Sequence, residues 1–281
     1  MTIPDYMIIG AMKCGTTTLA VQLGMQAGLF MTSPKEPNFF SDDSVFAKGF
    51  DWYCGLFTPA GDMDLKGEAS THYTKLPDLP QTLPRLQKAC EIPPKIIYLI
   101  RDPIARALSH YIHEWTMGTI TSDLDTALRE HPALVDYGRY AMQIAPWVET
   151  FGAQAIHVDT LEAMQADPQS LMARLGAFLG RPDLQWRDDI APQNVSSERL
   201  QRRPLDRLLI TNPVATSLRR TLVPRTLRNR IKAGRRLQTR PEISKDDRAR
   251  LVAIFAKDRS DLHTLFPGRS DLDAAYAAIL S

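Results

Sequence analysis

The chain has 281 residues, 44% of them hydrophobic and 23% charged, and a formal net charge of +2 at pH 7. This composition is typical of a globular protein, and the length allows one large domain or two small ones. No apolar run approaches the length of a membrane span, and the N-terminus lacks the basic segment and apolar core of a signal peptide, so we expect neither.

The three cysteines, Cys14, Cys54 and Cys90, are odd in number, far apart, and without the spacing of a metal site. This pattern favours a reducing compartment without structural disulfides or zinc. We therefore expect a cytoplasmic protein.

Charge is distributed unevenly, because residues 199–240 contain thirteen Lys or Arg and a single acid, Asp206. Such a segment is either a solvated helical surface or an electropositive rim for an anionic cofactor, an acidic substrate or a membrane. It lacks interleaved aromatic residues, so we expect no nucleic-acid partner. Peripheral membrane contact through residues 199–240 stays open as an alternative.

Residues 6–19 predict a short apolar strand, a loop bounded by glycines, and a helix that opens on threonines. Unpaired N–H groups at such a helix start, with the helix dipole, favour a phosphate or a sulfate. Gly10 and Gly15 keep the spacing of a nucleotide-binding P-loop. However, Lys13 lies inside the loop, and Thr16 follows the second glycine where a Walker loop has lysine. A plain glycine turn between strand and helix is the alternative.

The next segments are less regular. Two prolines within residues 33–37 block helix and central strand alike, so we expect a loop there. Phe39 and Phe40 are expected in the core. Residues 66–69 are a weak strand candidate.

Residues 95–100 form the strongest strand candidate, a continuous apolar run typical of a strand buried on both faces. Pro103, just beyond it, suits the first turn of a helix. In a magnesium-dependent kinase or ATPase, a strand of this type ends in an aspartate, whereas here Arg101 comes first. Asp102 is either that acid or the N-cap of the helix.

The remainder predicts a short strand at 155–158 and helices at 170–179, ending at Gly180, and near 204–211, 217–232 and 245–265. Strands that alternate with helices indicate a mainly parallel sheet covered on both faces. The expected fold class is α/β, a P-loop-like three-layer fold with a helical C-terminal cap. We expect a single domain, 1–281, with a core at 1–195 and a basic helical region at 196–281.

Four motifs together resemble the sulfotransferases that use 3′-phosphoadenosine 5′-phosphosulfate (PAPS). Residues 13–17 are similar to the loop that binds the 5′-phosphosulfate, and residues 98–111 to the 3′-phosphate motif. Residues 35–40 and 67–73 resemble two further signatures, which narrow the match to the branch with the heparan sulfate sulfotransferases and many bacterial relatives. The motifs cover about the first 115 residues, and the C-terminal third matches only loosely.

This resemblance implies roles for the matching residues. The 5′-phosphosulfate would be held by Lys13, Cys14, Gly15, Thr16, Thr17 and Thr18. The 3′-phosphate would be bound by Arg101, whose planar guanidinium group offers paired donors to phosphate oxygens, and by Ser109. Residues 194–203 are the nearest counterpart of a loop that closes over the nucleotide, so Arg199, Arg202 and Arg203 are further candidates. The expected contacts with the acceptor substrate are Lys35, His72 and His113.

Glu68 matches the acid that these enzymes are thought to use as general base, and His113 matches a histidine near the acceptor. The sequence departs from the motif at Ala69, where lysine is common, and at His72, where asparagine is common. Because relatives with small hydroxyl acceptors use a histidine base, His72 is a rival to Glu68. A strand-end salt bridge at Glu68 and a plain surface position for His113 are the structural alternatives.

The implied reaction is in-line transfer of a sulfuryl group to a hydroxyl or amine of a glycan, lipid or small molecule. Lys13 would neutralise the leaving charge, loop N–H groups would stabilise the transferring oxygens, and no metal would be required. The alternatives are a P-loop nucleotide kinase and a non-catalytic nucleotide-binding protein.

Overall fold

Five parallel strands form one sheet in the computed structural model, which describes residues 4–90, 92–190 and 240–280. The spatial order is β2-β3-β1-β4-β5, and each neighbouring pair is parallel. The strands are β1 (Tyr6–Gly10), β2 (Leu29–Met31), β3 (Leu65–Ala69), β4 (Lys95–Ile100) and β5 (Ile156–Thr160). The predicted parallel sheet is therefore confirmed, and β2 is an addition to it.

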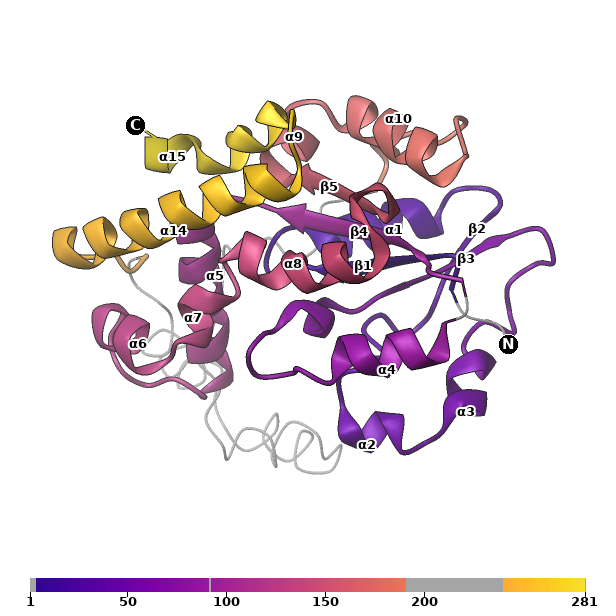
Figure 1. Cartoon of the computed structure of the whole chain (residues 1–281), viewed down its shortest axis with the longest axis horizontal. Helices are drawn as coiled ribbons and strands as arrows, with labels where there is room; N and C mark the ends of the chain where they lie inside the picture. Colours follow the sequence, from indigo (N-terminus) through magenta and orange to yellow (C-terminus); the bar gives the residue numbers. More distant parts are fainter. Residues whose placement is uncertain (1–3, 91, 191–239, 281) are drawn as a thin grey trace, which may run out of the picture.

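Helices surround this sheet (Figure 1). They are α1 (Thr16–Gly24), α2 (Asp43–Phe46), α3 (Phe50–Gly55), α4 (Thr82–Ala89), α5 (Pro103–Met117), α6 (Leu124–Glu130), α7 (Ala133–Asp136), α8 (Tyr140–Phe151), α9 (Leu161–Ala166), α10 (Pro168–Leu179), α14 (Lys245–Leu265) and α15 (Ala277–Leu280). Three 3₁₀ turns complete the description: η1 (Thr71–Thr74), η2 (Ala153–Ala155) and η3 (Ser270–Tyr276). The α/β fold class is confirmed.

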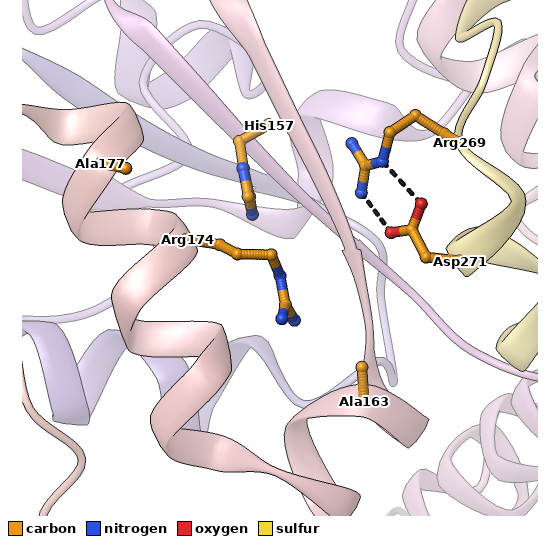
Figure 2. Close-up of a pocket in the computed structure, with 6 residues that line it drawn as sticks. All are labelled: His157, Ala163, Arg174, Ala177, Arg269 and Asp271. Atoms are coloured by element: carbon orange, nitrogen blue, oxygen red, sulfur yellow. Dashed lines mark hydrogen bonds and ion pairs between the residues drawn. The ribbon is translucent and has the colours of Figure 1, made fainter.

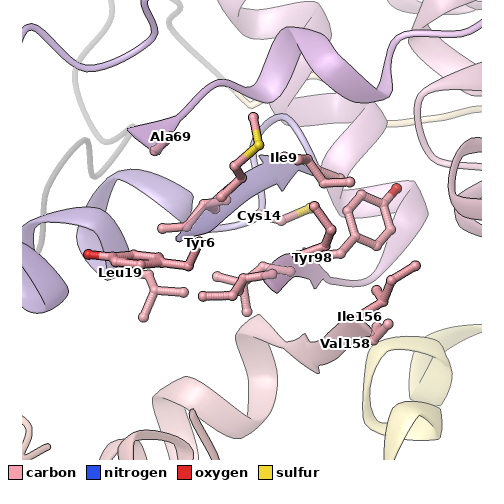
Figure 3. Packing of buried hydrophobic residues seen from close by; sticks show 14 of the residues in the cluster. Tyr6, Ile9, Cys14, Leu19, Ala69, Tyr98, Ile156 and Val158 are labelled. Carbon is pink, nitrogen blue, oxygen red and sulfur yellow. The ribbon is translucent and has the colours of Figure 1, made fainter. Parts of the chain in front are cut away.

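The main core lies on both faces of the sheet. Every residue of β1 and β5 is buried, which requires a covering layer on each side. Figure 3 shows Tyr6 and Leu19 at one end of this core and Ile156 and Val158 at the other. The predicted core residues Phe39 and Phe40 are buried as well.

A second core joins the C-terminal helix to the rest. Leu251 and Phe255 of α14 pack among apolar residues of α5, α6 and α7. Figure 1 shows α14 running alongside α8. Asp258 of α14 accepts hydrogen bonds from the N–H groups of Ala141 and Met142, at 3.0 and 3.2 Å, at the start of α8. The predicted helix at 245–265 is thus confirmed as part of a C-terminal cap.

The helix boundaries follow the expected chemistry. Asp102 Oδ1 accepts the N–H of Ala105 at 2.9 Å, and Pro103 is the first residue of α5. Asp102 is therefore the N-cap of a helix. Gly180 ends α10 in the left-handed conformation, with φ 77°.

Several predictions lie outside the described residues: the helices near 204–211 and 217–232, the candidate contacts Arg199, Arg202 and Arg203, and the boundary at 195/196. The division of the chain into core and C-terminal region stays a prediction. Within the described ranges, none of the helices combines the length and the apolar character needed to cross a membrane.

Candidate functional site

The loop between β1 and α1 is shaped by its two glycines. A Cβ on Gly10 would lie 2.1 Å from Thr74 Oγ1 and 2.8 Å from the Tyr98 ring, so only glycine fits. Gly15 is the N-cap of α1 and has φ 87°, a conformation that glycine adopts without strain. Because Gly15 carries no side chain, the first N–H groups of α1 are not capped by their own N-cap residue. The predicted order of strand, glycine loop and helix is confirmed, and anion binding by the loop stays a prediction.

Arg101 reaches this loop from the end of β4. Its Nη1 donates a hydrogen bond to the carbonyl oxygen of Lys13 at 3.2 Å. Its Nε is buried and has no hydrogen-bond partner among the described residues. The structure therefore brings Lys13 and Arg101 together, and it leaves a buried donor of Arg101 unused.

Tyr140, at the start of α8, contacts both the glycine loop and the segment that follows β4. Its hydroxyl donates to the carbonyl oxygen of Arg101 at 2.8 Å and lies 3.6 Å from Cys14 Sγ. Burial raises the pKa of Cys14 to about 11, so the thiol is neutral. Cys14 thus packs inside the loop, and Tyr140 is a site residue that the sequence analysis missed.

The helix α5 carries the other residues of the 3′-phosphate motif. Ser109 and His113 lie in its second and third turns and are half-buried. Arg106, by contrast, is fully buried, and its guanidinium donates to the carbonyl oxygen of Leu134 and contacts His110 Nδ1 at 3.4 Å. These contacts make Arg106 a structural residue between α5 and α7.

Glu68 lies in β3 opposite Met7 of β1, and its side chain is fully buried. Neither carboxyl oxygen has a hydrogen bond of normal geometry within the described part of the chain. Burial raises the pKa of Glu68 to about 8, against a smaller lowering by the hydroxyls of Tyr73 and Tyr53. The carboxyl is therefore a weak acid that titrates near neutral pH, covered from solvent.

His72 and Lys35 lie in a polar cluster just beyond β3. Lys35 Nζ pairs with Glu36 Oε1 at 2.7 Å, and Thr71 Oγ1 donates to the same oxygen at 3.2 Å. Burial, followed by the charge of Lys75, lowers the pKa of His72, so the imidazole is neutral at pH 7. Each expected acceptor contact from this region is half-buried and close to Glu36.

A separate cavity of about 510 Å³ lies along the outer edge of the sheet, beside β5 (Figure 2). His157 and Arg174 point into it, opposite Arg269 and Asp271. Its charges are compensated, since Arg174 pairs with the buried Asp159 at 2.8 Å and Arg269 with Asp271 at 2.7 Å. None of the residues that line this cavity belongs to the glycine loop.

No group of His, Cys, Asp or Glu in residues 4–90, 92–190 and 240–280 is arranged to hold a metal ion. The described geometry is a glycine-bounded anion loop at the carboxyl end of a parallel strand, with an arginine from the neighbouring strand. Ligands of open α/β sheets bind at this edge. The fold thus defines a P-loop-like α/β protein, with a glycine loop and an arginine as candidates for binding an anion.

The sulfotransferase domain model matches residues 3–206, most of the chain. The chain belongs to the sulfotransferase domain family.

Two curated relatives illustrate the sequence similarity. A bifunctional heparan sulfate N-deacetylase/N-sulfotransferase 1 of Caenorhabditis elegans is 25% identical over 200 residues, covering 65% of this chain and 22% of the relative. A membrane-associated sulfotransferase of Dictyostelium discoideum is 36% identical over 114 residues, covering 40% and 23%. The chain therefore spans about a fifth of the length of these relatives.

Two solved structures share the fold. A sulfotransferase from Alicyclobacillus acidocaldarius has a TM-score of 0.66 at 23% identity, over 94% of this chain and 96% of that one. A mouse sulfotransferase complexed with PAP has a TM-score of 0.52 at 15% identity, over 99% and 89%.

Proposed function

We propose that this chain transfers the sulfuryl group of PAPS to a hydroxyl or amine of an acceptor molecule. The observation that carries the proposal is the hydrogen bond from Arg101 to the carbonyl oxygen of Lys13. It joins an anion-binding loop to an arginine that still has a buried, unpartnered N–H. A donor with phosphates at both its 5′ and 3′ positions suits this pair of sites.

The glycine loop, Arg101 and Ser109 have separate roles in binding the donor in this scheme. The N–H groups at the start of α1 bind the 5′-phosphosulfate, and Lys13 neutralises charge on the 5′-phosphate as it leaves. Arg101, with Ser109, binds the 3′-phosphate, because a guanidinium offers paired donors to phosphate oxygens.

In the transfer step, the acceptor oxygen or nitrogen forms a bond to sulfur as the bond from sulfur to the bridging oxygen breaks. The acceptor's proton passes to Glu68, and the bridging oxygen stays on the 5′-phosphate. A pKa of about 8 suits Glu68 to this role, since a base works best when its pKa lies near the operating pH. The acceptor reaches this buried carboxyl only if the side chains that cover it move.

The acceptor class rests on the relatives, which include heparan sulfate N-sulfotransferases. A glycan, lipid or small molecule with a free hydroxyl or amine fits the reaction. The kinase alternative is not favoured, because Asp102, its candidate metal ligand, caps α5 through Ala105.

Binding and mass spectrometry test the proposal. Calorimetry should detect binding of 3′-phosphoadenosine 5′-phosphate (PAP) in the presence of EDTA. Cell extracts treated with the enzyme and PAPS labelled with heavy sulfur should contain a product whose mass has increased by one labelled sulfate. Binding of ATP with magnesium, but not of PAP, would support a kinase instead. PAP binding without any sulfated product would support a nucleotide-binding protein without catalysis.

A further inference from the structure

The short helix α9 follows β5 directly and packs against the glycine loop. Its first turn is fixed by Thr160, whose Oγ1 accepts the N–H of Ala163 at 2.9 Å. Leu161 and Met164 fill the space beside Gly15, each with a carbon atom 2.8 Å from the position of a Cβ there. A substitution that moved α9 would therefore reach the loop.

Glu162 of α9 also contacts the second anion-binding segment. Its Oε1 accepts the N–H of Asp102 at 2.9 Å. The carbonyl group of the same peptide bond belongs to Arg101 and accepts the hydroxyl of Tyr140 at 2.8 Å. The peptide unit that follows Arg101 is thus held at both ends by side chains from two other elements.

The second oxygen of Glu162 is buried and has no hydrogen-bond partner in the described ranges. Burial raises the pKa of Glu162, while the N–H of Asp102 and the charge of Arg101 lower it by less. This carboxyl therefore lies near the Arg101 charge, in an environment that penalises its own ionisation. Because burial of this carboxyl is energetically unfavourable, we expect the side chain to have a role beyond packing.

We propose that Glu162 is a positioning residue for the 3′-phosphate site, which fixes the Arg101–Asp102 peptide unit so that Arg101 faces the Lys13 loop. The inference rests on the proposed function, because it assumes that Arg101 binds the 3′-phosphate. Glu162 itself does not touch the nucleotide in this scheme. It acts through the hydrogen bond to Asp102, so an acceptor oxygen is required and a negative charge is not.

The variants Glu162→Ala, Glu162→Gln and Glu162→Asp separate these contributions. Calorimetric dissociation constants should be measured for PAP and for adenosine 5′-monophosphate, which lacks only the 3′-phosphate. Glu162→Ala should weaken the binding of PAP by about ten-fold and the binding of adenosine 5′-monophosphate by less than about three-fold. Glu162→Gln keeps an oxygen that can accept from Asp102 and should restore PAP binding to within about three-fold of wild type. Glu149→Ala, at an exposed position of α8, is the matched control and should change neither constant.

If Glu162→Ala does not fold, Glu162→Asp carries the test, because its carboxyl is withdrawn by one methylene and should also weaken PAP selectively. Equal losses for both nucleotides, or an unrestored loss in Glu162→Gln, would overturn the inference while leaving PAP binding by the wild type intact. Absence of PAP binding by the wild-type chain would overturn the proposed function, and this inference with it.

Discussion

The hydroxyl group of Tyr140 lies between Arg101 and Cys14, 2.8 Å from the carbonyl oxygen of one and 3.6 Å from the sulfur of the other. It therefore connects the two segments that are proposed to bind the two ends of the donor.

We expect Tyr140→Phe to weaken PAP binding about five-fold, since a net hydrogen bond contributes about 1 kcal/mol. Isothermal calorimetry measures this change. Tyr276→Phe is a suitable control, because the Tyr276 hydroxyl is buried and has no hydrogen-bond partner within the described residues. If both variants bind PAP as wild type does, Tyr140 does not help to hold Arg101 in place.

Arg101→Ala should weaken the binding of PAP far more than the binding of adenosine 5′-monophosphate. The lost interaction is a charge-assisted hydrogen bond, worth about 1.5–3 kcal/mol, so PAP affinity should fall by about ten-fold or more. The comparison of the two nucleotides is the control, since both contain the adenosine and the 5′-phosphate. Equal losses would place Arg101 away from the 3′-phosphate.

Local patterns were enough to predict much of the sheet edge that forms this site. The continuous apolar run of β4 and the Asp102–Pro103 cap are signals carried by adjacent residues, and both appear in the structure. The strand β2 has only three residues, too few for a periodic signal. The helix α8 contains Pro146 in its interior, which in a sequence argues against a helix.

Tyr140 and Glu162 could not be found in the same way. Their contacts with the Arg101–Asp102 peptide unit span 39 and 60 positions of the chain. Nothing in the spacing of neighbouring residues indicates such contacts, because they depend on how α8 and α9 pack against the ends of β4 and β5. The burial of Glu68 beside Tyr53 and Tyr73 is likewise a tertiary property.

Gly10→Ala should destabilise the fold. The added methyl would lie 2.1 Å from Thr74 Oγ1 and 2.8 Å from the Tyr98 ring, and overpacking of this kind costs about 1–3 kcal/mol. Thermal unfolding should show a melting temperature lowered by several degrees. Gly55→Ala is the control, because no heavy atom lies within 4 Å of the added Cβ. An unchanged melting temperature for Gly10→Ala would contradict the close packing described for the loop.

Glu68→Gln should leave PAPS binding within a few-fold and reduce turnover by about two orders of magnitude, as expected for a lost general base. His72→Ala should mainly change the KM of the acceptor, because His72 lies beyond β3 in the polar cluster with Glu36. Steady-state kinetics with the acceptor found by mass spectrometry measures both effects. Near-normal turnover in Glu68→Gln together with an inactive His72→Ala would assign the base to His72.

The pH dependence provides a separate test of Glu68, whose pKa is raised to about 8 by burial. Because the base must be ionised, kcat/KM should rise with pH and level off above about pH 8.

The contribution of Glu68 to the unfolding free energy should instead decrease as pH rises. The folded state keeps its proton up to about pH 8, whereas the unfolded carboxyl loses its proton near its model value of 4.5. The folded protein then binds more protons than the unfolded one between these values, so this group lowers the unfolding free energy as pH rises through that window. Glu68→Gln cannot ionise, and its unfolding free energy relative to wild type should therefore increase from pH 5 to pH 8. A relative stability that is constant with pH would show that Glu68 has an ordinary pKa.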